Sequence, residues 1–249
     1  MKRVFLAFIA SASIASSAAA ADLETVEATP DLWSGWHIGL NAGYGDSSNS
    51  VEGSSGDFFP ATEISQFPSP ELDTKPSGFF GGAQLGADWA LGSVLVGLEG
   101  DFQLSDIDGS ETQCTVLGGC ADPDRYTADQ SLDWFSTARV RLGLPIDRFL
   151  VYATGGIAIG EVDLSANLIN NDETDAWPAS SSKIEFGWTA GAGASWLFSD
   201  KASIGLEYLY VDLGDRTLSV EGTGPAVEFV NYEFENKFHI AKISLNFHF

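Results

Sequence analysis

Charged residues of both signs recur at alternate positions within apolar, glycine-rich stretches of this chain. Glu99 and Asp101 lie two residues apart, as do Arg139 and Arg141. Alternate residues of a β-strand point to the same face of a sheet, so each pair would project to one side. Buried carboxylates and guanidinium groups are tolerated when they pair with each other. The spacing therefore predicts buried ion pairs between two neighbouring strands.

Further charged residues occupy alternate positions of their segments that would place them on the same side of the sheet: Asp88, Asp133, Glu207 and Lys242. Two interpretations of this inward set stay open. In the first, the ion pairs fill the space that the sheet encloses and close it; in the second, they rearrange and open a polar path for ions. The first is favoured, because a narrow enclosed space has room only for tightly packed side chains.

Histidines are the other residues that could carry chemistry. The same parity places His37 and His248 inward near one end of the strands and His239 outward. Nucleophilic catalysis needs a nucleophile beside a positioned base, and the pattern brings no serine, histidine and acid together. We therefore predict no catalytic residues, no metal site and no bound cofactor.

The two cysteines, Cys114 and Cys120, flank the sequence Thr-Val-Leu-Gly-Gly. Two glycines permit the tight reversal that would bring the Cα atoms within about 6 Å. Disulfides persist in exported proteins. We predict a bond between these two residues; a pair of free thiols is the alternative, and half of a metal site is disfavoured because the loop contains no histidine or third cysteine.

Composition narrows the class of protein. The 249 residues carry 35 acidic and 12 basic side chains, a net charge of −23, which leaves no basic surface for nucleic acid. Hydrophobic residues make up 44% of the chain and aromatic residues 12%, too much for a disordered protein. Together with 27 glycines, this composition favours strands and turns over helices.

The N-terminus has the pattern of a secretory signal: two basic residues, an uncharged apolar stretch, and three alanines that end at Ala21. We interpret residues 1–21 as a cleaved signal peptide, 22–33 as a short periplasmic segment and 34–249 as one domain. No second apolar stretch is long enough to span a membrane as a helix. A soluble exported protein and a closed outer-membrane β-barrel remain.

Eight segments alternate in character with a period of two. We predict strands at 34–45, 77–90, 93–104, 131–143, 148–161, 185–198, 202–213 and 237–249. Short connections alternate with long acidic ones at 46–76, 105–130, 162–184 and 214–236. Short periplasmic turns and long outer loops are typical of outer-membrane barrels. The predicted fold is all-β: an eight-stranded antiparallel up-and-down transmembrane β-barrel with long extracellular loops and short periplasmic turns, and with both termini in the periplasm.

One face of each segment is apolar and has aromatic residues near its ends. Five of these residues are predicted to form two girdles at the membrane interfaces: Trp36, Tyr44, Phe79, Trp89 and Phe198. The ten residues from Phe79 to Trp89 would span roughly 25 Å in a tilted strand, the height of a lipid-facing band. The apolar faces are therefore predicted to meet lipid; a soluble β-sandwich with an aromatic core is the alternative.

Several strands resemble those of a known family. The opening stretch Trp33-Ser-Gly-Trp-His-Ile-Gly-Leu-Asn-Ala-Gly-Tyr-Gly45, together with Gly81-Gly-Ala-Gln-Leu-Gly-Ala-Asp-Trp89, is similar to strands of the small porin-like outer-membrane β-barrel surface proteins of alphaproteobacteria. That family includes hemin-binding members, and the OmpA-like transmembrane domain is a more distant likeness. The resemblance implies a location in the outer membrane of a Gram-negative bacterium. His37 departs from the pattern, which has a tyrosine or a similar aromatic residue there.

The last strand resembles the signal that the outer-membrane assembly machinery reads. The residues that carry this resemblance are Lys242, Ser244, Phe247 and Phe249, with Ser244 in place of the usual glycine. An unpaired final strand with an aromatic face could dock on a sheet edge before the barrel closes. An ordinary edge strand is the alternative.

Three functional hypotheses follow. The first is an integral outer-membrane surface protein, not an enzyme, with a structural or interaction role and at most weak porin activity. The second, implied by the resemblance, is surface binding of heme or another small ligand. The third is a barrel enzyme that modifies lipid. Expected partners are outer-membrane lipid, lipopolysaccharide and the assembly machinery, and heme or a host or cell-surface molecule is a further candidate.

Overall fold

The computed structural model describes residues 32–55, 71–114, 125–169, 176–223 and 229–249. The predicted signal peptide, most of the predicted periplasmic segment, and Cys120 lie outside these ranges. The strands are β1 (Gly35–Asp46), β2 (Ser50–Ser55), β3 (Glu71–Asp73), β4 (Ser77–Leu91), β5 (Val94–Cys114), β6 (Arg125–Ile146), β7 (Phe149–Ile169), β8 (Ala176–Ser199), β9 (Ala202–Asp212), β10 (Arg216–Glu221), β11 (Phe229–Phe234) and β12 (Lys237–His248). In these ranges no helix has the length and apolar character needed to cross a membrane.

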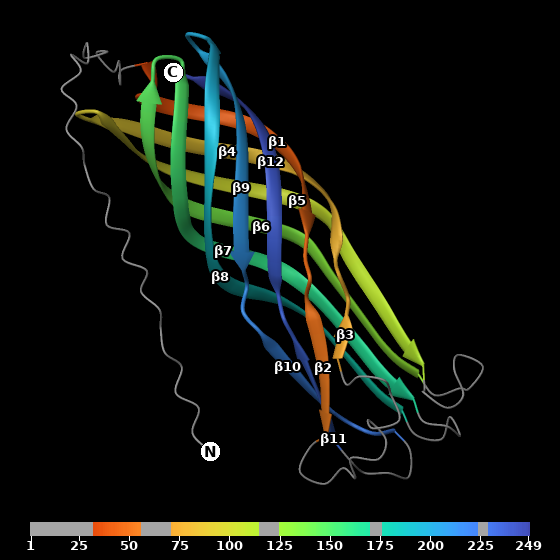
Figure 1. Cartoon of the computed structure of the whole chain (residues 1–249). Helices are drawn as coiled ribbons and strands as arrows, with labels where there is room; N and C mark the ends of the chain where they lie inside the picture. The colour runs from red at the N-terminus through yellow and green to blue at the C-terminus, as the bar shows by residue number, and fades with distance from the viewer. Residues whose placement is uncertain (1–31, 56–70, 115–124, 170–175, 224–228) are drawn as a thin grey trace, which may run out of the picture.

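Eight of the strands form a closed barrel in the order β1-β12-β9-β8-β7-β6-β5-β4 (Figure 1). The ring closes because β1 pairs antiparallel with both β12 and β4. Closure removes the free sheet edge and satisfies backbone groups within the wall. The predicted all-β class and eight-stranded antiparallel order are confirmed.

Three tight connections lie at one end of the barrel, which we call the turn end, and the C-terminus lies there too (Figure 1). They join β4 to β5, β6 to β7 and β8 to β9. Gly92 and Asp147 make their reversals with positive φ of 65° and 54°, a conformation that glycine adopts without strain and that aspartate tolerates. The opposite end is called the outer end.

Strands β5 to β8 run well past their predicted limits, so the predicted loops 105–130 and 162–184 are largely strand wherever they are described. The period of two continues there, but the two faces exchange character. Near the turn end the outward residues are apolar, whereas beyond the predicted limits they include Ser110, Asp129 and Ser165, and the buried inward residues include Tyr126 and Leu164. The extensions were missed because the prediction looked for strands with an apolar outward face, whereas here the outward face is polar and the inward face is apolar.

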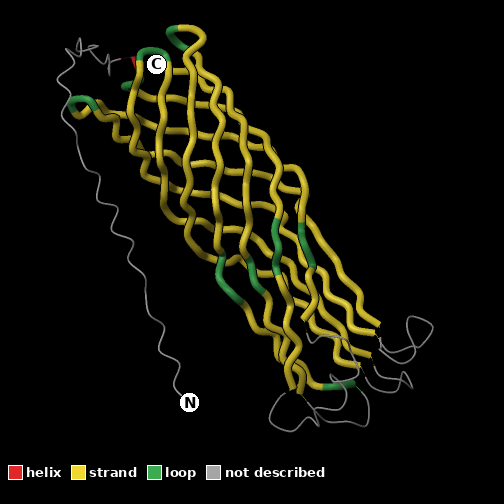
Figure 2. Tube along the Cα trace, in the orientation of Figure 1, coloured by secondary structure: helices red, strands yellow, loops and turns green. Residues whose placement is uncertain are grey.

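The other four barrel strands are interrupted and then continue. A second sheet in the order β10-β11-β2-β3 prolongs β9, β12, β1 and β4 toward the outer end. Figure 2 shows the breaks as loops that separate the barrel from this outer sheet. The predicted long connections 46–76 and 214–236 thus contain four short strands, which form a sheet of their own beside the extended β5 to β8.

A buried amide on β6 ties the interruptions together. The Gln130 Oε1 atom accepts hydrogen bonds from Thr74 Oγ1 at 3.0 Å and from Asn49 Nδ2 at 3.3 Å. Its Nε2 atom donates to Asn236 Oδ1 and to the carbonyl oxygen of Glu235, both at 2.8 Å. Because buried polar groups must be hydrogen-bonded, this junction fixes where the barrel ends and the outer sheet begins.

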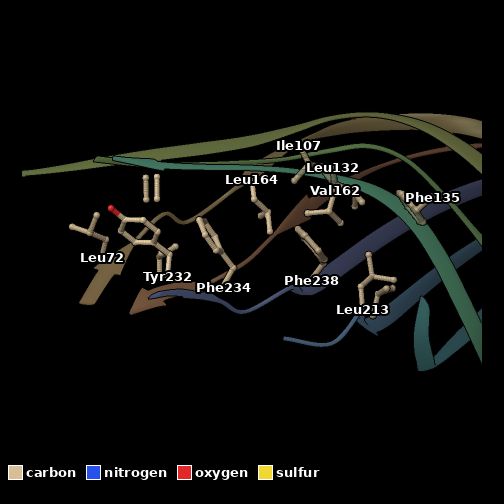
Figure 3. Packing of buried hydrophobic residues seen from close by; sticks show 14 of the residues in the cluster. Leu72, Ile107, Leu132, Phe135, Val162, Leu164, Leu213, Tyr232, Phe234 and Phe238 are labelled. Carbon is tan, nitrogen blue, oxygen red and sulfur yellow. The ribbon is translucent and has the colours of Figure 1, made fainter. Parts of the chain in front are cut away.

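An apolar core fills the space between the outer sheet and the extended β5 to β8 (Figure 3). Its labelled members are Leu72, Ile107, Leu132, Phe135, Val162, Leu164, Leu213, Tyr232, Phe234 and Phe238. The Tyr232 hydroxyl donates to the carbonyl oxygen of Trp177 at 2.8 Å, and burial raises the pKa of Tyr126 and Tyr232 above the usual range. The outer part of the lumen is therefore packed like the interior of a soluble protein.

One residue of the predicted inward set faces the other way. A bulge places Asp133 opposite no residue of β7, between the pairs of Leu132 and Trp134. An extra residue shifts the alternation by one, so Asp133 is exposed outside and its neighbour Leu132 is buried inside. The prediction for Asp133 is wrong for this reason.

The junction makes a prediction about local stability. In Gln130→Ala, each buried group left without its partner costs about 1–3 kcal/mol. We expect amide hydrogen exchange in β2 and β11 to accelerate at least about tenfold while the barrel strands keep their protection. Ser131→Ala, beside it but facing outward, is the matched control, and equal exchange in the two variants would contradict the role given to Gln130.

Candidate functional site

Charged side chains fill the turn-end half of the lumen. The lumen network consists of Asp88 from β4, Glu99 and Asp101 from β5, Arg139 and Arg141 from β6, Glu207 from β9 and Lys242 from β12. All seven are buried. Glycines on the same inward faces leave room for them: a Cβ atom at Gly97 would lie 2.1 Å from Asp88 Oδ1.

Arg139 is the centre of the network. Its Nη1 atom lies 2.8 Å from Glu207 Oε1, and its Nη2 atom lies 2.8 Å from Asp101 Oδ2 and 2.5 Å from Glu99 Oε1. Its Nε atom donates to Thr137 Oγ1 at 2.9 Å. One guanidinium group thus binds three carboxylates, and hydrogen bonds to ionised partners are the strong ones.

Lys242 links the same carboxylates from the opposite wall. Its Nζ atom lies 2.6 Å from Glu207 Oε2 and 3.3 Å from Asp101 Oδ2. In the ring, β12 and β9 are separated from β5 and β6 by other strands on both sides. The ion pairs therefore cross the lumen and hold its two walls together.

Arg141 extends the network toward the turn end. Its Nη2 atom lies 2.5 Å from Asp88 Oδ2, and its Nη1 atom lies 3.2 Å from Glu99 Oε2. The guanidinium carbon sits 4.9 Å from the centre of the Tyr152 ring, a cation–π contact. Each of the three cations of the network thus contacts at least two carboxylates, and Arg141 contacts an aromatic ring as well.

His37 belongs to this network, although the sequence pattern gave only its inward orientation. Its Nδ1 atom lies 3.3 Å from Asp88 Oδ2 and its Nε2 atom lies 3.3 Å from Glu99 Oε2. Its ring centre is 5.6 Å from that of His248, whose Nε2 atom is 2.9 Å from the Ser203 hydroxyl. The register of β1 on β4, His37 opposite Gly86, is what brings it beside Asp88.

Trp33 closes the lumen at the turn end, a role that sequence reasoning missed because it assigned 22–33 to a periplasmic segment. The indole is 1% exposed. Its Nε1 atom donates to the carbonyl oxygen of Asp147 at 3.2 Å, and the ring meets His248 edge-on at 5.7 Å. It packs with Leu95, Leu150, Tyr152 and Leu197. An aromatic residue just before the first periodic segment was the available signal.

The predicted girdle residues all face outward and are exposed: Trp36, Tyr44, Phe79, Trp89 and Phe198. Tyr44 and Phe79 meet edge to face at 5.2 Å, on paired residues of β1 and β4. His239 also lies outward, with Nδ1 2.5 Å from the Tyr208 hydroxyl. The structure thus separates an apolar exterior belt from the charged lumen.

The last residues also divide between the two faces. Lys242 and Ser244 are buried inside, whereas Phe247 and Phe249 are exposed outside. The Phe249 N–H donates to the carbonyl oxygen of Trp36 at 3.0 Å, and the Trp36 N–H donates back at 3.1 Å. The final residue therefore completes the seam where the barrel closes.

Of the predicted disulfide, the structure describes one half. Cys114 is the last residue of β5 and its sulfur is in a disulfide. Cys120 lies outside the described residues, so its pairing with Cys114 stays a prediction.

The network makes a prediction about stability. Arg139→Ala leaves three buried carboxylates without their central cation, and breaking a buried ion pair in this way costs about 3–5 kcal/mol. Arg148→Ala removes an exposed pair with Asp200, 2.8 Å apart, and should cost less than about 1 kcal/mol. Urea unfolding of the refolded protein in detergent measures both, and equal losses would contradict the central position of Arg139.

Comparisons with known proteins agree with this architecture. Residues 6–249 match the model of the outer membrane protein beta-barrel domain. The chain is 37% identical over 261 residues to the 31 kDa outer-membrane immunogenic protein of Brucella melitensis, and this alignment covers 100% of each chain. It is 30% identical over 149 residues to the 22 kDa outer membrane protein of Rhizobium leguminosarum bv. viciae, over 60% of this chain and 59% of that one.

Among solved structures, the outer membrane protein OprG of Pseudomonas aeruginosa aligns with a TM-score of 0.49 at 13% identity, over 87% of this chain and 97% of that one. The family match spans nearly the whole sequence, and the relative from Brucella is similar from end to end. The chain therefore belongs to the outer-membrane β-barrel protein family and is located in the outer membrane of a Gram-negative bacterium.

Proposed function

We propose that this protein is a non-catalytic surface protein whose closed barrel anchors the outer sheet in the membrane and presents it to the exterior, with at most weak porin activity. The observation that carries the proposal is the filled lumen. Trp33 occupies the turn end, the lumen network follows, and the apolar core occupies the outer part. A pore would require all three layers to rearrange.

The energetics of these layers favour the closed state. Separating one buried ion pair costs about 3–5 kcal/mol. At that cost, fewer than about one molecule in a hundred would have even one pair broken at a given moment. Arg139 alone contacts three carboxylates. Brief openings at low frequency are the most that this lumen supports.

The exterior supports the orientation and the partners that we propose. Apolar side chains cover the turn-end half, bounded by aromatic residues such as Trp89 and Phe79, which suits outer-membrane lipid. The extended strands bear polar residues such as Asp129 and Ser165 on the same side, which suits the aqueous, lipopolysaccharide-covered exterior. The turn end then faces the periplasm.

The other hypotheses find less support. His37 and His248 lie in the lumen beside Trp33, and His239 is on the apolar exterior against Tyr208, so these histidines do not converge on a heme-sized cavity. The Ser203 hydroxyl beside His248 is the kind of contact that nucleophilic catalysis needs. His248 is packed against Trp33 and His37, and no acid lies at hydrogen-bond distance from its ring among the described residues. We therefore favour neither heme binding nor catalysis.

The closed lumen can be tested by single-channel recording. We expect refolded protein in planar bilayers to conduct rarely and briefly. A shift in migration between unboiled and boiled samples in SDS gels, expected for a closed barrel without free edges, identifies the folded fraction. A large and steady conductance from heat-modifiable protein would overturn the proposal.

We further propose that the assembly machinery recognises the C-terminal strand. Deleting Phe249 removes an exposed aromatic side chain worth only a few kcal/mol of burial, together with its hydrogen bonds to Trp36. We expect the truncated chain to accumulate in the periplasm, whereas Phe102→Ala, which removes an equally outward aromatic ring from β5, should reach the outer membrane. Equal fractionation of the two variants would contradict recognition of the C-terminus.

A further inference from the structure

Two carboxylates lie beside the His37 ring. Nε2 is 3.3 Å from Glu99 Oε2 in hydrogen-bonding geometry, and Nδ1 is 3.3 Å from Asp88 Oδ2 without the alignment of a hydrogen bond. A neutral imidazole that donates from Nε2 to Glu99 would hold a lone pair on Nδ1 close to the negative Asp88 carboxylate. The imidazolium ion removes this repulsion, because it still donates to Glu99 and places a positive charge beside both carboxylates.

The charges of the lumen network lead to the same conclusion independently. The network contains four carboxylates, Asp88, Glu99, Asp101 and Glu207, and three permanent or strongly basic cations, Arg139, Arg141 and Lys242. One negative charge is left over. A buried charge without a partner is strongly unfavourable, and a proton on His37 supplies the fourth positive charge.

The other groups around His37 allow one such proton and not two. Arg141 from β6 approaches through Asp88 and Glu99, and Tyr152 from β7 lies under its guanidinium group. From β12, the His248 ring is 5.6 Å away and is hydrogen-bonded to Ser203. A second positive charge on His248 would repel both His37 and Arg141, so His248 remains neutral.

The surroundings also hold the ring in place. A Cβ atom at Gly86, the residue opposite His37 in the register, would lie 2.3 Å from the ring carbon Cε1. Trp33 and His248 cover the ring toward the turn end, and His37 is 1% exposed. The site is therefore shaped for this side chain and shielded from water.

We propose that the lumen contains a binding site for one structural proton, held on His37 between Asp88 and Glu99, and that the folded barrel is stable only while this proton is bound. This inference does not depend on whether the barrel conducts. The folded state retains the proton at pH values where the unfolded chain has lost it. Stability is therefore present at neutral and mildly acidic pH and is lost as the pH rises.

Nitrogen NMR tests the protonation state directly. The chain has three histidines, so selective ¹⁵N-histidine labelling in micelles gives few signals, and His37→Gln and His239→Gln assign them. At neutral pH we expect one ring with both nitrogens protonated, absent from His37→Gln and retained in His239→Gln. A neutral tautomer at His37 would overturn the proposal.

Unfolding in urea between about pH 6 and about pH 10 tests the link to stability. Above about pH 6.5, where the unfolded chain has lost the histidine proton and the folded barrel keeps it, the wild-type folding equilibrium constant should fall by up to about tenfold per pH unit more than that of His37→Gln. The difference should level off once the folded barrel also releases the proton. His239→Gln, on the exterior, should follow the wild type. Matching pH dependence in the wild type and His37→Gln would overturn the proposal.

A double variant tests the charge count. His37→Gln alone leaves four carboxylates against three cations and should be destabilised at neutral pH. Adding Asp88→Asn restores three against three, so His37→Gln/Asp88→Asn should be more stable than His37→Gln, without the alkaline decline of the wild type. A double variant less stable than His37→Gln would contradict the requirement for neutrality.

Discussion

The contact of one guanidinium group with three carboxylates is the interaction on which the rest of this barrel depends. Arg139 reaches Glu99 and Asp101 on its neighbouring strand and Glu207 on the far side of the lumen. A ring of eight strands leaves too little space for water to replace these contacts. The walls therefore sit at the separation that the ion pairs allow, and the small residues between them, such as Gly97, follow from that spacing.

The molecule has two opposite arrangements of polarity along its length. In the turn-end half the exterior is apolar and the interior is charged; beyond the Gln130 junction the interior is apolar and the exterior polar. Each half follows from its surroundings, lipid in the first case and water in the second. The bulge at Asp133 lies near this change, and in β6 it moves the alternation by one residue.

The alternation of strand residues between the two faces of the sheet explains what the sequence could predict. The period of two is imposed by the strand itself, so the inward positions of Glu99, Arg139 and Lys242 could be read from their neighbours. The partners of His37 could not, because they depend on the register between β1 and β4. The orientation of Asp133 was predicted wrongly because the sequence around it contains no signal for a bulge. The role of Trp33 was missed because this residue precedes the periodic segments. The extensions of β5 to β8 were missed because their polarity is reversed.

The aligned interruptions of four strands give this molecule a natural boundary for redesign. β1, β4, β9 and β12 all break at one level, whereas β5 to β8 continue without a break. The segment beyond each break can therefore change in length or sequence without altering the pairing of the residues that face lipid, provided that it still covers the apolar inner face of β5 to β8. Such a division lets the outer sheet vary in sequence while the lipid-facing barrel keeps its shape. The outer sheet could therefore be replaced to display foreign peptides on a cell.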